Sequence, residues 1–355
     1  MLPIIRSSTS RLLKPNQQLR TWMSVAGIER SHRALLFPGQ GSQQIGMGKD
    51  LYDRFPEITK EVYDQVDEAL QMSSRSLIFD GDQETLTLTE NAQPAILTTS
   101  IATLRVLEKE YGFELEKACA YVLGHSLGEY TALVASGSLS LMDAVKLVRL
   151  RGQAMTQAVM NQQRTGMMAL VGRKGKLDEI TEALKQLQDG GLPAGEVVEI
   201  GNINSSTQIV LSGTLNGLDE AAKYLKGKRM IAKSMLLPVS GPFHSSLVKQ
   251  AADVMADAFK TITFKQPTVQ VVSNVTGKPY TSVDDIPSSL VKHITTAVQW
   301  QQSINYCKNQ DVGDFVCFGP GKVLANMLSK DHSTDTIRSL DSIGDILDYV
   351  EEFKN

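Results

Sequence analysis

The sequence predicts an α/β fold in which a large domain with a mostly parallel sheet carries a smaller inserted subdomain. Two observations support this prediction. Short apolar runs alternate with longer helix-compatible segments along most of the chain, which is typical of strands joined by helical crossovers. Residues 166–235 instead follow a β-α-β-β-α-β order, typical of a compact unit with its own sheet. We therefore expect a large domain at 34–161 and 236–355 and a subdomain at 162–235.

The composition excludes several classes of protein. Hydrophobic residues make up 42% of the 355 residues and charged residues 21%, which is typical of a globular chain with a sizeable core. The net charge of −3 does not indicate a nucleic-acid partner, and no apolar run approaches the roughly 18 residues of a membrane span. The cysteines, Cys119, Cys307 and Cys317, lack the spacing of a disulfide framework or a structural zinc site.

The first 28 residues differ from the rest of the chain. They contain four basic residues, no acidic residue, and many Ser, Thr and Gln residues. This composition is typical of a mitochondrial transit peptide, whereas a secretory signal would need a longer apolar segment. We expect residues 1–28 to be a leader that directs the chain to the mitochondrial matrix. A disordered basic tail is the alternative.

Residues 34–37 predict a strand, and a glycine-rich loop follows it as far as Gly46. The spacing of the glycines fits neither a dinucleotide-binding turn nor a P-loop, so phosphate binding is disfavoured. Glycines also let one loop approach another closely. We expect this loop to bring an amide donor of Gln40 beside Ser126.

Ser126 is the candidate nucleophile. The apolar run 120–123 predicts a buried strand, the G-x-S-x-G sequence 124–128 follows, and residues 127–135 are compatible with a helix. Strand, sharp turn and helix are the context in which this motif holds the nucleophile of α/β-hydrolase folds. The large domain is therefore expected to be α/β-hydrolase-like, with the Leu127 N–H available to an oxyanion. A plain Gly-Ser loop is the alternative.

Two long helices flank this segment. The first is predicted over about 91–111, with Pro94 in its first turn, where a missing N–H has no effect. The second is predicted over about 141–160, with Ser140 and Asp143 as a capping pair at its start.

Arg151 lies on the second helix, away from its polar face. Lys146, Arg149, Gln153 and Thr156 recur at helical spacing and define that face, and Arg151 lies about 200° from Arg149 around the axis. An inward guanidinium needs an anion. The anion is either a ligand or a structural carboxylate, unless the side chain bends out to solvent.

The subdomain is predicted to be ferredoxin-like, with the βαββαβ order. Its expected strands and helices are, in order, 166–171, 177–187, 196–200, 208–212, 215–225 and 230–235. A polar turn containing Asn202 and Asn204 follows the second strand, and it either lines a site or is a plain turn.

His244 lies in a Gly-Pro loop that opens a helix predicted over 246–259. The apolar runs 270–274 and 315–318 predict two more strands, and His293 lies in a helical segment between them. In a parallel sheet, the loops at the carboxyl ends of the strands collect the site.

Eight separated motifs together resemble malonyl-CoA:acyl-carrier-protein transacylase, a family that includes the acyltransferase domains of fatty-acid and polyketide synthases. The resemblance covers about residues 34–330 and, with the leader, the chain resembles the mitochondrial form. In order, the motifs are Phe37–Gln43, Gly124–Tyr130, Arg151-Gly152, Gly166–Ala169, Asn202-x-Asn204, Gly241–Ser245, Val298–Trp300 and Gly319–Leu324.

The resemblance implies roles for the matching residues. Ser126 would be the nucleophile and His244 the general base, and Gln40 and Leu127 would support the oxyanion. Arg151 would hold the malonyl carboxylate. Asn202 and Asn204 fall on a further motif and are assigned to substrate binding.

The sequence departs from the family at two positions. A backbone carbonyl orients the base in this family, and the matching position is His293, where glutamine is expected. Because the contact comes from the main chain, we expect it to survive the change. Cys317 stands where an acidic residue is usual.

The resemblance implies transfer of a malonyl group from malonyl-CoA to phosphopantetheinylated acyl carrier protein, for mitochondrial fatty-acid synthesis. The CoA thioester is then a substrate, and no metal or redox cofactor is expected. A serine hydrolase is one alternative, disfavoured by the lack of an evident Asp in Ser-Asp-His order and by the inward Arg151. A non-catalytic module that binds a carrier protein is the other.

Overall fold

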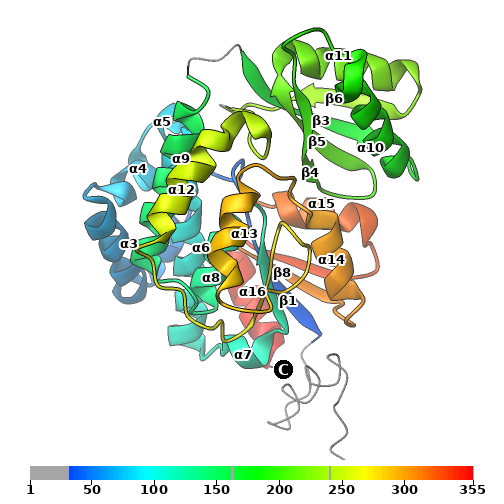
Figure 1. Cartoon of the computed structure of the whole chain (residues 1–355). Helices are drawn as coiled ribbons and strands as arrows, with labels where there is room; N and C mark the ends of the chain where they lie inside the picture. Colours follow the sequence, from blue (N-terminus) through cyan, green and yellow to red (C-terminus); the bar gives the residue numbers. More distant parts are fainter. Residues whose placement is uncertain (1–31, 161–163, 240, 355) are drawn as a thin grey trace, which may run out of the picture.

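The computed structural model describes residues 32–160, 164–239 and 241–354 (Figure 1). The expected leader, residues 1–28, lies outside the described residues. Within the described ranges, no helix has the length and apolar character needed to cross a membrane.

A five-stranded sheet forms the centre of the large domain, and the predicted α/β fold is confirmed. Its order is β7-β2-β1-β8-β9, and every pair is parallel. The strands are β1 (Arg33–Phe37), β2 (Tyr121–Gly124), β7 (Gln270–Val272), β8 (Asp314–Phe318) and β9 (Thr336–Leu340). Strand β9 was not predicted from the sequence, because only Ile337 and Leu340 of this edge strand are apolar and only Leu340 is fully buried.

Helices cover both faces of this sheet. Successive residues of β1 point to opposite faces, so that Leu35 and Phe37 join one core cluster and Ala34 and Leu36 another. The first cluster includes residues of α6 (Thr89–Tyr111), α8 (Gly128–Ala135), α9 (Leu141–Gln157), α12 (Lys249–Phe259), α13 (Asp285–His293) and α16 (Ile343–Lys354). The second includes residues of α14 (Trp300–Lys308) and α15 (Val323–Asp331).

Six further elements complete the large domain. They are α2 (Lys49–Arg54), α3 (Pro56–Leu70), α4 (Ser74–Asp80), α5 (Gln83–Thr87), α7 (Leu115–Ala118) and the 3₁₀ turn η2 (Ser246–Val248). The helix predicted over 246–259 is therefore a 3₁₀ turn followed by α12.

Helix α6 begins at Thr89, so the prediction that Pro94 lies in the first turn was wrong. Pro94 lies inside the helix and cannot donate to the carbonyl of Glu90, four residues earlier. Arg149 of α9 donates to that carbonyl at 3.4 Å and to Asn91 Oδ1 at 2.9 Å. The Arg149 guanidinium thus supplies a hydrogen bond that proline cannot make, and it joins α6 to α9.

Helix α9 has the predicted cap and the predicted inward arginine. The Ser140 side chain accepts from the Asp143 N–H, as expected for the capping pair. Lys146 and Gln153 are exposed, whereas Arg151 is only 2% exposed. The helix ends at Gln157, slightly earlier than predicted.

The subdomain forms a separate four-stranded sheet of order β4-β5-β3-β6 in which every pair is antiparallel. This is the predicted ferredoxin-like arrangement. Its elements are β3 (Thr165–Gly172), α10 (Leu177–Gln186), the π turn η1 (Leu187–Gly191), β4 (Val198–Ile203), β5 (Gln208–Thr214), α11 (Leu215–Gly227) and β6 (Ile231–Leu236).

Asn202 lies within β4, so the prediction that it lies in the following turn was wrong. Main-chain hydrogen bonds with the large domain lengthen this strand beyond its apolar run. Ile203 N–H donates to the Val298 carbonyl, and Val298 N–H donates to the Gly201 carbonyl, both at 2.9 Å.

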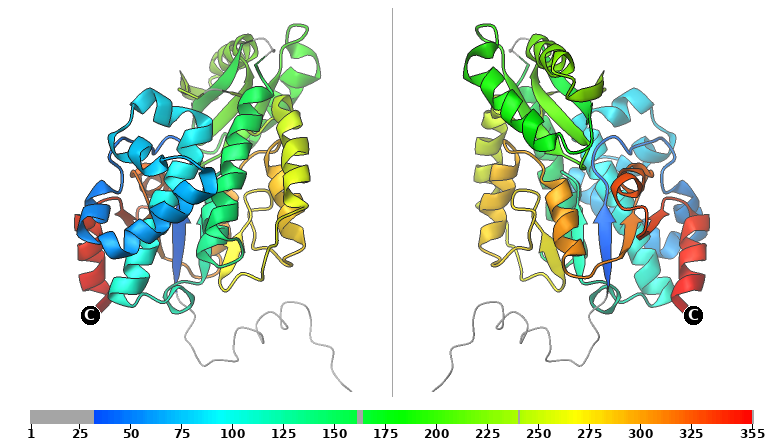
Figure 2. Two further views of the ribbon diagram at one scale, coloured as in Figure 1. Left: turned by 90° about the vertical axis from the view of Figure 1, so that its left-hand side faces the viewer. Right: turned by 90° about the vertical axis from the view of Figure 1, so that its right-hand side faces the viewer.

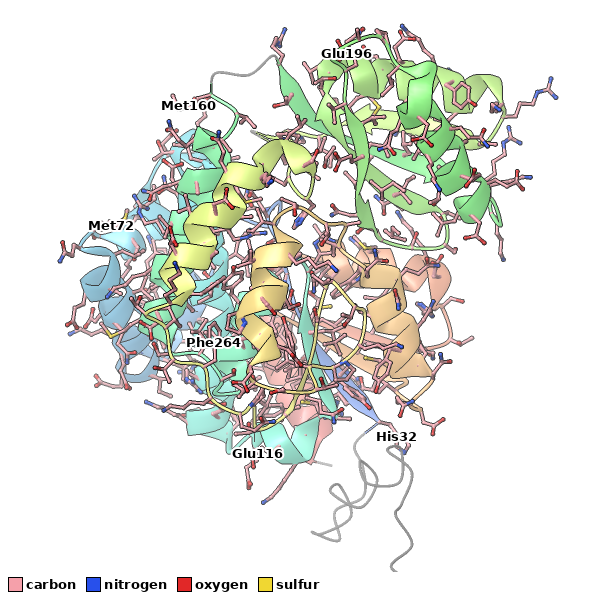
Figure 3. The ribbon with its side chains drawn as sticks, in the orientation of Figure 1. His32, Met72, Glu116, Met160, Glu196 and Phe264 are labelled. Carbon is pink, nitrogen blue, oxygen red and sulfur yellow. The ribbon has the colours of Figure 1, made fainter. Side chains whose placement is uncertain are left out.

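The subdomain lies beyond the carboxyl ends of the parallel strands (Figure 2). Side-chain bonds fix its β4 side to the large domain. Asp331 accepts from the Ser206 N–H at 2.6 Å and from its hydroxyl at 2.8 Å, and Glu199 accepts from the Ser246 N–H at 3.0 Å. Met160, labelled in Figure 3, lies where the chain leaves α9 toward the subdomain and is 67% exposed.

Candidate active site

Ser126 lies on a sharp turn between β2 and α8. Its φ is 52°, a left-handed conformation that is strained for a residue with a side chain. A Cβ at Gly124 would lie 2.0 Å from the Gly128 carbonyl carbon, and one at Gly128 would lie 2.3 Å from the Phe37 carbonyl oxygen. The turn therefore requires both glycines of the motif for close packing.

Asn274, which follows β7, holds this turn in place. Its Oδ1 accepts from the Ser126 N–H at 2.8 Å, and its Nδ2 donates to the Gly124 carbonyl at 2.7 Å. This role of Asn274 was not predicted from the sequence. The available signal was an amide side chain just beyond a strand that proves to lie beside β2.

Ser126 and His244 are brought together from distant parts of the chain. Ser126 Oγ lies 2.8 Å from His244 Nε2, and His244 Nδ1 lies 2.8 Å from the main-chain oxygen of His293. A carbonyl oxygen only accepts, so Nδ1 carries the proton and Nε2 presents a lone pair to the serine hydroxyl. The pKa of His244 is well below its usual value, mainly because of burial and also because of His293 and Arg151. The imidazole is therefore neutral and suited to act as a base.

Arg151 reaches Ser126 from α9. Nη2 lies 3.1 Å from Ser126 Oγ, and Nη1 donates to Gln93 Oε1 at 2.7 Å. Within the described residues Arg151 has no carboxylate in ion-pair contact, and its Nε has no hydrogen-bond partner. The alternative that Arg151 pairs with a structural carboxylate is thus not found among the described residues. The guanidinium has donors left for an anion beside Ser126. Gln93, a buried polar residue of α6, was also not predicted from the sequence.

The glycine-rich loop after β1 lies against the turn that holds Ser126. A Cβ at Gly39 would lie 2.6 Å from the His125 carbonyl oxygen, so the two loops touch. The Gln40 side chain points elsewhere, since its Nε2 donates to Thr89 Oγ1 at 3.3 Å. The main-chain N–H groups of Gln40 and Leu127 have no acceptor among the described residues. An oxyanion-binding role for Gln40 therefore falls to its main chain.

Asn202 and Asn204 contact the histidine of the motif. Asn204 Oδ1 lies 2.9 Å from His125 Nε2, and Asn202 Nδ2 lies 3.4 Å from the same atom. The His125 ring packs edge-on against Trp300, with ring centroids 5.4 Å apart. Neither asparagine forms a hydrogen bond with Ser126 or His244, so in this structure they join the subdomain to the turn that holds Ser126.

The His293 side chain adds a buried cluster that the sequence analysis missed. Its ring stacks on the His244 ring, with centroids 4.8 Å apart, and its Nδ1 lies 3.1 Å from Glu129 Oε2. Burial raises the pKa of Glu129 to about 7, against the opposing effect of the Tyr280 hydroxyl. Glu129 is the only fully buried acidic residue in the described ranges.

Cys317 lies in β8 and belongs to the core. It is 3% exposed, and burial raises the pKa of its thiol to about 12. The described residues contain no group of three or more His, Cys, Asp or Glu side chains arranged to hold a metal ion.

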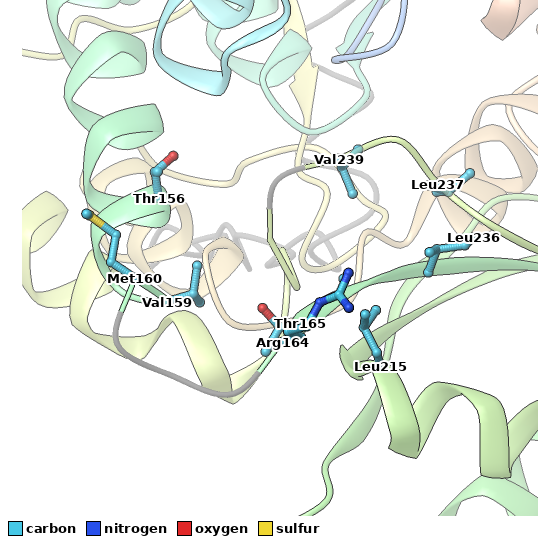
Figure 4. A pocket seen from close by; sticks show the side chains of 10 residues that line it. Thr156, Val159, Met160, Arg164, Thr165, Leu215, Leu236, Leu237 and Val239 are labelled. Carbon is cyan, nitrogen blue, oxygen red and sulfur yellow. The ribbon is translucent and has the colours of Figure 1, made fainter.

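A cavity of about 400 Å³ lies where α9 leads into the subdomain (Figure 4). Val159, Leu215, Leu236 and Val239 give it an apolar lining, and Arg164 adds a positive charge. None of the candidate site residues lines it, so it is distinct from the cluster around Ser126.

Comparison with known proteins places these residues in a family context. Residues 34–334 match the acyl transferase domain. The chain is 44% identical over 297 residues to a malonyl CoA-acyl carrier protein transacylase of Bacillus subtilis (strain 168), covering 84% of this chain and 89% of that protein.

Solved structures of transacylases are also similar to this chain. The malonyl CoA-acyl carrier protein transacylase of Coxiella burnetii has a TM-score of 0.84 and 32% identity, covering 92% of this chain and 99% of that one. A malonyl-transacylase in complex with its type II PKS acyl-carrier protein has a TM-score of 0.83 and 31% identity, covering 91% and 100% of the two chains.

Proposed function

The chain belongs to the malonyl-CoA:acyl-carrier-protein transacylase family and is an acyltransferase, and we propose that it transfers malonyl groups through an ester on Ser126. The donor is malonyl-CoA and the acceptor is the phosphopantetheine thiol of an acyl carrier protein. One observation carries the proposal. Ser126 Oγ lies 2.8 Å from a neutral imidazole and 3.1 Å from a guanidinium that has no carboxylate partner among the described residues.

The first half of the reaction forms the acyl-enzyme. His244 Nε2 takes the Ser126 proton as Oγ attacks the thioester carbonyl, and the developing oxyanion accepts from the main-chain N–H groups of Leu127 and Gln40. One such donor is worth roughly 3–4 kcal/mol in the transition state. The His244 imidazolium then protonates the departing CoA thiolate, which leaves malonyl-Ser126.

The second half reverses these roles with a different thiol. His244 takes the proton of the carrier's phosphopantetheine thiol, whose sulfur attacks the ester, and returns a proton to Ser126 as malonyl leaves. CoA and the carrier therefore act as alternating substrates. The groups named here suffice for both steps, so the proposal assigns no metal or redox cofactor.

Arg151 selects the malonyl group. Its free donors match a carboxylate, which a guanidinium binds through two parallel hydrogen bonds. Acetyl-CoA lacks this carboxylate and would leave the buried guanidinium unpaired, a penalty of roughly 2–5 kcal/mol. This arrangement favours an acidic acyl group over a neutral one and disfavours a general esterase.

We further propose that the enzyme supplies extender units for fatty-acid synthesis in the mitochondrial matrix. The basic, acid-free composition of residues 1–28 supports this location. Imaging of a fluorescent fusion tests it. Mitochondrial import of the full chain and cytosolic retention of a chain lacking residues 1–28 are expected, and cytosolic fluorescence of the full chain would contradict it.

The function is tested by intact mass spectrometry of the protein with malonyl-CoA and, separately, acetyl-CoA, followed by peptide mapping. The expected result is a malonyl adduct on Ser126 that a phosphopantetheinylated carrier protein removes. An adduct lost equally fast to buffer would indicate a hydrolase. Carrier binding without any adduct would indicate a binding module.

A further inference from the structure

A buried carboxylate and a second histidine ring lie behind the reacting pair, and the mechanism above uses neither side chain. Glu129 and His293 are 0% and 1% exposed. The His293 ring is stacked on the His244 ring, with 23° between their planes. Any change of charge or tautomer on His293 therefore acts directly on the proposed base.

The contact between Glu129 and His293 requires a proton. Nδ1 of His293 and Oε2 of Glu129 are 3.1 Å apart, although their alignment is not that of a full hydrogen bond. The other oxygen, Oε1, accepts from the Tyr280 hydroxyl at 2.5 Å and from the Asn274 N–H at 3.3 Å. Since two lone pairs at this distance repel in a buried site, one atom of the pair carries a proton toward the other.

The surrounding charges give this proton a function. His244 becomes an imidazolium when it takes the Ser126 proton, and Arg151 already places a positive charge beside Ser126. The group that orients His244 is the neutral carbonyl of His293, so it does not neutralise the imidazolium as the Asp of a catalytic triad does. Glu129 is the buried acid of the described chain that supplies a negative charge here.

We propose that Glu129 and His293 form a positioning pair that holds one exchangeable proton and thereby sets how readily His244 accepts the proton of Ser126. In the active state, Glu129 is ionised and His293 Nδ1–H points to it. When the pair takes one proton from solvent, the Glu129 carboxyl donates to Nδ1 and the His293 proton resides on Nε2. The effect on catalysis rests on the proposed acylation of Ser126.

The environment favours protonation of the carboxylate over protonation of the ring. Burial raises the pKa of Glu129 to about 7, whereas burial, Arg151 and His125 hold the pKa of His293 well below its usual value. Protonated Glu129 therefore prevails below neutrality and the ionised form above it. The titratable and charged groups around the pair are His125, Tyr130, Arg151, His244 and Tyr280.

The test measures the rate of single-turnover malonylation of the full chain as a function of pH, using quenched-flow mass spectrometry. The wild-type rate is expected to rise through an inflection near pH 7, the value that burial gives Glu129. Glu129→Gln keeps an acceptor for Tyr280 but should lose the inflection. Above pH 8 its rate should be roughly tenfold lower than that of the wild type, which is the effect of lowering the pKa of His244 by about one unit. Tyr280→Phe should move the inflection to higher pH, because it removes a hydrogen bond that favours the carboxylate.

Two variants of His293 separate the ring from the main-chain carbonyl, which both retain. His293→Leu offers Glu129 no proton partner and should move the inflection to higher pH. His293→Gln offers a donor and an acceptor and should move it less. A uniform loss of rate with an unmoved inflection in both variants would reduce the ring to a packing role and overturn the proposal.

NMR of ¹⁵N-histidine-labelled protein tests the pair without any substrate. The wild-type His293 signal should change from the Nδ1–H tautomer to the Nε2–H tautomer as the pH falls through the same inflection, and Glu129→Gln should abolish the change. A tautomer change in a protein that is never malonylated would support the pair and refute the proposed function. Malonylation of Ser126 with a pH-independent His293 tautomer would refute the pair alone.

Discussion

Replacing Arg151 by alanine separates selection of the acyl group from the chemistry at Ser126. The guanidinium is 2% exposed, has no carboxylate in contact among the described residues, and donates to Gln93 and Ser126. Removing it deletes the group that would pair with the malonyl carboxylate. The serine, the imidazole and the oxyanion donors remain in place.

The expected magnitude follows from the burial of this charge. Losing one partner of a buried, hydrogen-bonded charge pair has an effect of about 2–5 kcal/mol, which is roughly a 30- to 5,000-fold loss of kcat/KM for malonyl-CoA. Acetyl-CoA should suffer no such loss, because Arg151 makes no pair with it and is left unpaired in the wild-type complex. The ratio of the two specificity constants should therefore fall by at least about 30-fold.

The assay is the rate of acyl-enzyme formation with each thioester. Arg149→Ala is the matched control, because Arg149 lies two residues away on α9 and bonds to Asn91 and the Glu90 carbonyl, away from Ser126. It should alter stability but leave the ratio unchanged. An Arg151→Ala enzyme that kept its preference for malonyl-CoA would refute the assigned role.

Three further predictions concern the reacting groups and their support. Measured by mass spectrometry, Ser126→Ala should form no acyl-enzyme, whereas His244→Ala should form it about 10²- to 10⁴-fold more slowly than the wild type. Malonylation of Ser126→Ala at the wild-type rate would show that the nucleophile is another residue. Asn274→Ala leaves the Ser126 N–H and the Gly124 carbonyl without the Asn274 side chain as partner. The free energy of unfolding measured in urea should fall by about 1–3 kcal/mol, and acylation of Ser126 should be slower. An unchanged acylation rate would contradict the supporting role of Asn274. Because the pKa values of His244 and His293 are lowered in the folded protein, the unfolded chain binds more protons below about pH 6.5, and the melting temperature should fall as the pH drops from 6.5 toward 5. The melting temperature of a double variant with Gln at both histidines should fall less over the same pH range. An equal fall would show that other titrating groups cause the effect.

The sequence predicted the parts of the fold that local pattern determines. Apolar runs gave four of the five parallel strands, and the G-x-S-x-G sequence gave the turn that holds Ser126. The edge strand β9 was missed because only two of its five residues are apolar. The start of α6 was placed too late because proline usually marks a first turn. In that helix the Arg149 side chain compensates for the proline, and such compensation depends on tertiary contact.

The candidate site shows the same division between features set by local sequence and features set by tertiary contacts. Motifs pointed to Ser126, His244 and Arg151, which prove to lie within hydrogen-bonding distance of one another through Ser126. Glu129 and Asn274 were not selected, although Glu129 directly follows the G-x-S-x-G sequence, because their roles arise from which strands and helices lie side by side. A single chain without its fold gives no sign that a glutamate on α8 faces a histidine at the end of α13.

Ser126 and His244 share an unusual backbone feature, since their φ values of 52° and 59° both lie in the left-handed region. Each such residue is destabilised by about 1–3 kcal/mol, and the surrounding structure must hold it there. Glycine at either position would relieve the strain and abolish the reactive side chain. Stability and reactivity thus oppose each other at these two positions, and a lineage selected for folding alone would drift toward an inert protein with the same architecture.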